Sequence, residues 1–407
     1  MSFLLTGGSV LRAGASELDR NCDVLVEGDR IKEVGPGLSS PSATRIDLAG
    51  RTLMAGLVDA HVHVTAASVN IGENAAEPSS LVALRAARLM NAMLMRGFTT
   101  VRDVGGADHG LKRAVELGLI DGPRLVISGK ALGQTGGHTD FRPRSDNRGT
   151  FDDRLGALGR IADGVDAVRR AAREEIRAGA DLIKIMANGG VASPNDPIHA
   201  LGYSRDEIRA AVEEAENAGT YVSAHLYTDR AIRRAVACGV HSLEHCNLIQ
   251  AETARLAAEA GCIACPTLVA YEGLAMEGEA LGLGAESIAK IETVRRGGME
   301  SLAIMREAGL PMAYGSDLLG GLQKYQSLEF TIRARVLPAA EILASAGPIA
   351  ARLCRLEGAI GTLEAGAYAD LIVVDGNPLA EIGILDGQGE RIPGIMKGGC
   401  FYKKAFP

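Results

Sequence analysis

Tryptophan is absent from this sequence of 407 residues, and aromatic residues make up only 4% of it. The hydrophobic core must therefore consist mainly of Ala, Val, Ile and Leu. No apolar run approaches the roughly 20 residues that a membrane-spanning helix needs. The first residues also lack the basic and apolar regions of a signal peptide. We therefore expect a cytoplasmic protein that does not enter a membrane.

An excess of basic residues is lacking as well. The sequence has 43 Lys and Arg against 50 Asp and Glu, a net charge of −7, which excludes the basic surface typical of nucleic-acid binding. Its seven cysteines are an odd number scattered along the chain, which argues against a disulfide framework. Cys262 and Cys265 form a CxxC motif, but a second such pair for a zinc ribbon is missing. We expect both to be buried in a strand.

The two ends of the chain have a different character from its middle. Short strand-like segments separated by Gly and Asp turns occupy both ends: 2–6, 22–27, 31–34, 44–47, 370–375, 394–397 and 399–402. The economical interpretation is a small composite β-sandwich domain formed by residues 1–54 and 361–407. Residues 55–360 would then be a second domain inserted between its two halves.

Helical and strand-like patterns alternate within residues 55–360. Eight short apolar segments predict strands: 56–61, 99–103, 124–128, 181–185, 221–225, 241–245, 262–265 and 311–316. Amphipathic helical patterns lie between most of them, for example at 82–96, 164–178, 205–218 and 229–237. This rhythm predicts an α/β fold, specifically a (β/α)8 TIM-like barrel. The carboxyl ends of barrel strands form the mouth where active sites are built.

Histidines follow three of these strands. His61 and His63 are two residues apart, so a strand would place both imidazoles on one side, where they can share a metal ion. A single histidine in such a position is more often a satisfied core residue than a ligand. His225 and His245, however, end consecutive strands of a barrel that already offers the HxH pair. Together these four side chains predict a metal site.

Two further polar residues end barrel strands. Asp317 could cap the following segment, or it could bind a metal and accept a proton from an attacking water. Lys184 shares its strand face with Leu182 and Met186, so it should point into the barrel. A buried ammonium is costly unless it is paired, for instance with Glu244. The alternative is a carbamate formed with CO₂, which would bridge two metal ions about 3.5–4 Å apart.

These residues resemble the binuclear pattern of the amidohydrolase superfamily. The segments 49–63 and 361–379 resemble its composite β domain, so the resemblance spans the chain. A narrower likeness, to the prolidase-type branch, is carried by five motifs: Gln134-Thr-Gly-Gly-His138, 184–194, Ala224-His-Leu-Tyr-Thr228, Glu244-His-Cys-Asn247 and Pro266-Thr-Leu-Val269. That branch cleaves C-terminal residues from dipeptides and N-acyl amino acids.

The resemblance implies a set of roles. Two divalent ions, Zn²⁺ in the first place with Mn or Co as substitutes, would be bound by six residues and would activate water to attack an amide. The ligands would be His61, His63, carboxylated Lys184, His225, His245 and Asp317. His138 and Tyr227 would bind either the oxyanion or the substrate carboxylate. The Asn188-Gly-Gly190 turn could add a backbone anion site.

The substrate is left open by the sequence. An Xaa-Pro dipeptidase is the first choice, because the motifs after the fourth and fifth strands resemble those enzymes. Glu272 could instead attract a basic C-terminal residue, and ochratoxin-type amides or cyclic amides remain alternatives. Deaminases commonly lack the fourth-strand lysine, and phosphotriesterases lack the composite β domain. A non-catalytic scaffold would typically have lost metal ligands. The resemblance also implies a homo-oligomer acting on small molecules.

Overall fold

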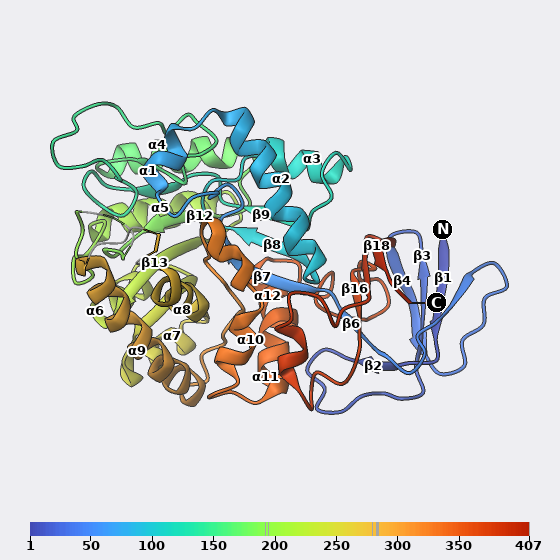
Figure 1. Cartoon of the computed structure of the whole chain (residues 1–407). Helices are drawn as coiled ribbons and strands as arrows, with labels where there is room; N and C mark the ends of the chain where they lie inside the picture. Colours follow the sequence, from blue (N-terminus) through green and yellow to red (C-terminus); the bar gives the residue numbers. More distant parts are fainter. Residues whose placement is uncertain (192, 194, 279, 282–284, 407) are drawn as a thin grey trace.

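The computed structural model describes residues 1–191, 193, 195–278, 280–281 and 285–406. The 184–194 motif thus includes two residues, Ala192 and Pro194, that lie outside the described residues. Figure 1 shows the helices of the middle of the chain gathered in one body, with strands from both chain ends beside it. Within the described residues, no helix combines the length and the apolar character that crossing a membrane requires.

Strands from the two ends of the chain form two sheets. The four-stranded sheet has the order β4-β3-β1-β5 and the five-stranded sheet the order β18-β17-β16-β6-β2. The second sheet therefore mixes N-terminal and C-terminal strands. The strands are β1 Ser2–Thr6, β2 Ser9–Leu11, β3 Asp23–Glu27, β4 Arg30–Gly35, β5 Thr44–Asp47, β6 Thr52–Ala55, β16 Leu371–Val374, β17 Gly394–Lys397 and β18 Cys400–Lys404.

A hydrophobic core of its own holds these terminal strands together. Val24, Leu53 and Val373 come from three different strands and are buried in one cluster. Seven of the nine strands lie where the sequence predicts them, whereas β2 and β6 were not predicted. The exact division into residues 1–54 with 361–407 and residues 55–360 stays a prediction.

Parallel strands make up the middle of the chain. One sheet has the order β7-β8-β9 and the other the order β11-β10-β12-β13-β14-β15. The strands are β7 Leu57–Val62, β8 Phe98–Asp103, β9 Arg124–Ile127, β10 Ala131–Gly133, β11 Gly159–Ile161, β12 Ile183–Met186, β13 Val222–Thr228, β14 Ser242–Leu248 and β15 Ile263–Cys265. Seven of the eight predicted barrel strands are therefore present, each within a few residues of its expected place.

The predicted eighth strand, at 311–316, is not a regular strand. The backbone of Ala313 donates to Ala264 of β15 (2.8 Å), and Ala60 of β7 donates to Tyr314 (2.8 Å). The Tyr314 amide, however, donates to Ser345 (2.9 Å), and the Ser316 amide to His61 (3.2 Å). Regular ladder pairing is interrupted because the Tyr314 amide bonds to Ser345 instead of to β7. The segment still lies between β15 and β7, while the closed eight-stranded barrel stays a prediction.

Helices follow most of the parallel strands. The four helical patterns predicted from the sequence correspond to α2 Ser79–Met95, α4 Val165–Arg177, α5 Arg205–Asn217 and α6 Asp229–Val236. A capping box between Ser204 and Glu207 begins α5. The other helices are α1 Ile71–Ala76, α3 His109–Glu116, α7 Ala251–Glu259, α8 Leu268–Glu277, α9 Ala285–Glu307, α10 Leu328–Arg333, α11 Ala339–Ala344 and α12 Ala350–Leu353.

Candidate metal centre

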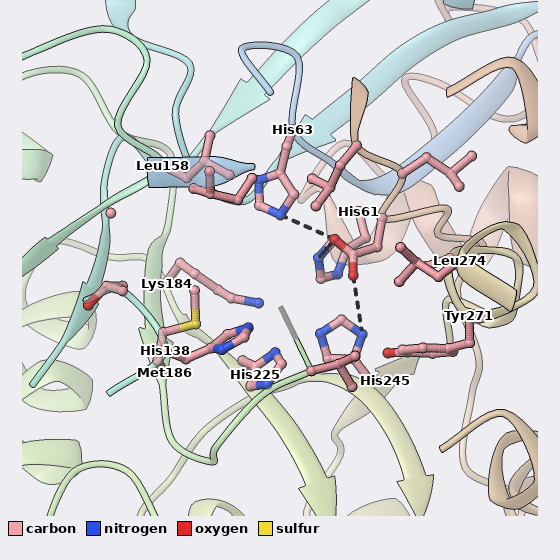
Figure 2. A pocket seen from close by; sticks show the side chains of 18 of the residues that line it. His61, His63, His138, Leu158, Lys184, Met186, His225, His245, Tyr271 and Leu274 are labelled. Carbon is pink, nitrogen blue, oxygen red and sulfur yellow. Dashed lines mark ion pairs between the residues drawn. The ribbon is translucent and has the colours of Figure 1, made fainter. Parts of the chain in front are cut away.

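One cavity brings together all the site residues predicted from the sequence. Its empty space amounts to about 800 Å³, a volume that includes open solvent at the mouth. Figure 2 shows the imidazole rings converging on it from several strands. The predicted residues that line it are His61, His63, His138, Lys184, His225, Tyr227, His245 and Asp317.

The Asp317 carboxylate faces three of the histidines. Its Oδ1 lies 3.3 Å from Nε2 of His61 and 3.3 Å from Nε2 of His63. Its Oδ2 lies 3.9 Å from Nδ1 of His245. Ligand atoms of His61, His245 and Asp317 all lie within 4.8 Å of one another, a spacing that a single metal ion could span. The dashed lines in Figure 2 follow these contacts.

Hydrogen-bond partners orient three of the histidines. Nδ1 of His63 donates to the Gly105 carbonyl (2.8 Å), and Nδ1 of His61 lies 2.7 Å from the Glu244 carboxylate. Nδ1 of His245 lies 2.8 Å from the Thr267 hydroxyl. A proton on Nδ1 leaves the Nε2 lone pair of His61 and His63 free, which is the usual arrangement of metal-binding histidines.

The backbone is strained beside these side chains. His245, Cys246 and Asp317 have φ angles of 70°, 58° and 51°, in the left-handed region that residues other than glycine rarely adopt. Such conformations cost on the order of 1–3 kcal/mol each, and they persist where the surroundings require them. Here they turn His245 and Asp317 towards the cavity.

Lys184 is buried without a partner. The side chain is 1% exposed, and its ammonium makes no hydrogen bond with the described residues. Burial lowers the pKa of Lys184 to about 8, even though Glu244 favours the charged form. Glu244 is already engaged by Arg102 and His61, so the expected ion pair between Lys184 and Glu244 is not formed. An unpaired buried amine fits the carbamate interpretation.

The protonation states of His225, His245 and Asp317 also suit a metal. Burial lowers the pKa values of His225 and His245 well below the usual range, and neighbouring histidines and Lys184 lower them further. Burial raises the pKa of Asp317, but His61, His63 and His245 outweigh it, and the pKa falls well below its usual value. Neutral imidazoles and an ionised carboxylate are the forms that bind divalent ions.

His138 and Tyr227 both pack against the His225 ring. The His138 ring stacks on His225 with centroids 4.2 Å apart, and its Nδ1 contacts the Ser193 hydroxyl (2.6 Å) and lies 3.4 Å from Asp196. The Tyr227 ring packs edge-on against His225 at 4.7 Å. Both polar groups therefore face the same cavity as the candidate ligands.

The prediction of an anion site at Asn188-Gly-Gly190 is wrong. The Gly189 amide donates to the Ala200 carbonyl (2.9 Å), and the Gly190 amide donates to Asp196 (2.9 Å). The turn instead supports His138, because a Cβ at Gly190 would overlap the imidazole ring. Glycine is therefore required at position 190 because the backbone packs closely against His138, and not because an anion binds there.

Sequence reasoning missed the residues that support the site. Glu244 was considered only as a partner for Lys184, and Asp196, Thr267 and Tyr271 were not singled out. The signal for Glu244 was present, because a charged residue within a predicted barrel strand needs a partner. The ion-pair partners of Glu244 are far from it in the sequence, so strand patterns cannot identify them.

Comparison with known proteins agrees with this geometry. Residues 52–399 match the model of the Amidohydrolase family. Ochratoxinase from Aspergillus niger is 31% identical, over 97% of this chain and 85% of the ochratoxinase. The crystal structure of an amidohydrolase is 52% identical, with a TM-score of 0.98 over 100% of both chains. A prolidase in complex with N-methylphosphonate-L-proline is 49% identical, with a TM-score of 0.97 over 99% of this chain and 100% of the prolidase.

The fold and these relatives define a hydrolytic enzyme that acts on amide bonds. The chain belongs to the Amidohydrolase family, and within it to the prolidase-type branch.

Proposed function

We propose that this enzyme is a binuclear metal-dependent dipeptidase that releases a C-terminal amino acid, with proline as the preferred leaving residue. The observation that carries the proposal is the convergence of four histidines, Asp317 and the unpartnered Lys184 on one cavity. The proposal includes a closed (β/α)8 barrel at 55–360 carrying the site, and the composite domain at 1–54 and 361–407.

The six side chains fit two divalent ions. His61, His63 and Asp317 would hold one, His225 and His245 the other, and carboxylated Lys184 would lie between them. Imidazole-rich ligation favours Zn²⁺ over Mg²⁺ or Ca²⁺. When bound, such ions polarise a carbonyl and lower the pKa of water.

The protein's own groups handle the protons. Asp317 is ionised and lies beside the candidate ligands, so it can accept the proton of the attacking water and pass it to the leaving nitrogen. The Tyr271 hydroxyl donates to the Tyr227 oxygen (3.1 Å), which leaves the Tyr227 proton free for an oxyanion. His138, which lies 3.4 Å from Asp196, would bind the substrate carbonyl or carboxylate.

Two observations favour proline as the leaving residue. The prolidase at 49% identity is described with a proline phosphonate, whose tetrahedral phosphorus on the proline nitrogen imitates the centre formed when water adds to an Xaa-Pro bond. Glu272, which could have attracted a basic residue, pairs with Arg295 (3.2 Å) and is not among the side chains that line the cavity.

An ochratoxin-type amide is the second candidate. The ochratoxinase relative aligns over nearly the whole chain. The cavity also presents apolar side chains, including Phe141, Met186 and Leu274, that could receive a bulky aromatic group.

Hydrolysis of a substrate panel tests both candidates. The Zn²⁺-loaded enzyme in bicarbonate would be assayed with Xaa-Pro, Xaa-Arg, Xaa-Lys and Xaa-Phe dipeptides, N-acyl amino acids, ochratoxin A and a hydantoin. Metal content would be measured alongside, with Asp317→Asn as the inactive control. Cleavage of Xaa-Pro with two ions per chain supports the proposal. Turnover of the hydantoin alone would replace it by a cyclic amidohydrolase, and absence of bound metal would contradict the catalytic assignment.

A further inference from the structure

Glu244 is completely buried next to the candidate metal centre without being one of the six predicted ligands. Four side chains contact its carboxylate. Oε1 accepts hydrogen bonds from Arg102 (2.8 Å), Ser223 (2.6 Å) and Ser242, and Oε2 lies 2.7 Å from Nδ1 of His61. Both oxygens are therefore occupied by donors that the protein itself supplies.

Arg102 anchors this carboxylate. The guanidinium is also fully buried, and it donates to the Ala60 carbonyl (2.5 Å), the Tyr221 hydroxyl (3.2 Å) and the Ser242 hydroxyl (3.0 Å). These partners lie on or beside strands on both sides of the site. Several bonds from one planar group restrict the position of Arg102, and its pair with Glu244 restricts Glu244 in turn.

These contacts determine which nitrogen of His61 carries the proton. Because the carboxylate can only accept, the His61 proton is placed on Nδ1 and the Nε2 lone pair is left free. Nε2 lies on the cavity side, 3.3 Å from Oδ1 of Asp317. Without Glu244, the imidazole could rotate or carry its proton on Nε2, and it would then be lost as a ligand.

Two other roles for Glu244 fit the contacts less well. Ligand atoms of His61, Glu244 and Cys265 also lie within 4.8 Å of one another, as a metal site would require. An ion there would have to displace at least one of the donors that already occupy the carboxylate oxygens. Pairing of Glu244 with Lys184 would likewise require the carboxylate to give up a donor. The Lys184 ammonium has no partner among the described residues.

We propose that Glu244, anchored by Arg102, is a positioning residue that sets the orientation and tautomer of His61 for metal binding. The inference rests on the proposed metal centre and adds a supporting residue that lies outside the ligand set.

Glu244→Gln in the full-length protein tests it. The substitution preserves the shape but places an amide NH₂ against either His61 or Arg102, both of which donate. We expect the affinity for Zn²⁺, measured by competition with a chromophoric chelator, to fall about 10- to 100-fold. The absorption spectrum of the Co²⁺-loaded protein should change as well, because a misplaced His61 alters the ligand geometry.

A second buried ion pair provides the matched control. Glu329 and Arg333 are both fully buried, with Nε and Oε1 2.7 Å apart, and neither is a candidate ligand. Glu329→Gln should lower the unfolding temperature while leaving the Zn²⁺ affinity unchanged. Equal loss of Zn²⁺ affinity in both variants would overturn the inference, since any buried pair would then have the same effect. Wild-type affinity in Glu244→Gln would overturn it too.

Two provisions keep the test decisive. If Glu244→Gln does not fold, Ser223→Ala with Ser242→Ala removes two donors to Oε1 and keeps Arg102. We expect a smaller loss of Zn²⁺ affinity there, and unchanged affinity would overturn the inference. A wild-type protein that binds no metal would overturn the proposed function itself, whereas wild-type binding with an unaffected Glu244→Gln variant would overturn only the role of Glu244.

Discussion

Replacing Lys184 by methionine should stabilise the metal-free protein while abolishing its function. The methionine would fill nearly the same space with an apolar side chain, whereas the native ammonium is 1% exposed and has no hydrogen-bond partner among the described residues. Residues kept for function often reduce stability in this way. The variant therefore separates a role in metal binding from a role in the fold.

The magnitude follows from the pKa of Lys184. Burial lowers it from 10.5 to about 8, which at about 1.4 kcal/mol per pKa unit amounts to about 3 kcal/mol. Below pH 8 both the folded and the unfolded chain bind the proton, so the full penalty is present at pH 7. It disappears as the pH rises from 8 to 10.5, because only the unfolded chain then remains protonated. We expect the free energy of unfolding to increase by up to about 3 kcal/mol at pH 7.

Urea unfolding of chelator-treated protein at pH 7 and pH 10 measures this difference, with bound metal determined in parallel. Lys130→Met is the contrasting control, since the Lys130 ammonium is partly buried but donates to the carbonyls of Arg154 (2.7 Å) and Ala157 (2.5 Å). That variant should be destabilised, because two carbonyls lose their donor. A metal-free Lys184→Met less stable than wild type, or one that still binds two ions, would refute the reasoning.

Three further outcomes are expected. Tyr227→Phe should lower kcat about 100- to 1000-fold with little change in KM, as for loss of an oxyanion donor; a change in KM alone would assign Tyr227 to substrate binding. Chelation should abolish hydrolysis, and Zn²⁺ with bicarbonate should restore it fully; recovery equally fast without CO₂ would contradict the carbamate. Burial lowers the pKa of Lys397 to about 8, so the free energy of unfolding of the wild type should rise between pH 8 and 10.5, and Lys397→Met should show a smaller rise. Urea unfolding measures this, and a difference between variant and wild type that stays constant with pH would contradict it.

The strand and helix positions could be predicted because their signal is local. Short strand-like segments marked β12, β13 and β14 within a few positions, and the polar residues at their ends marked the cavity. The segment at 311–316 was predicted from the same kind of local pattern. It departs from a regular strand because the Tyr314 amide donates to Ser345, a partner that no local pattern contains.

The contacts that support the site could not be predicted, for a related reason. His61 and Glu244 are 183 residues apart, and Arg102 and Glu244 are 142 residues apart. A periodicity argument places each on its strand face but does not say which side chains meet. The left-handed backbone of Asp317 is likewise imposed by tertiary contacts, since nothing in its sequence neighbourhood requires it.

The mixed sheet has a consequence for how the chain is synthesised. Strand β16 pairs with β6, with Val373 opposite Leu53 and Val374 opposite Thr52. About 320 residues must therefore leave the ribosome after β6, which takes roughly 15–65 s at 5–20 residues per second. During that time the edge of β6 that will pair with β16 exposes unpaired backbone groups and is open to aggregation or to capture by a chaperone. The sheet that contains β6 can therefore be completed only after the C-terminal strands have been synthesised.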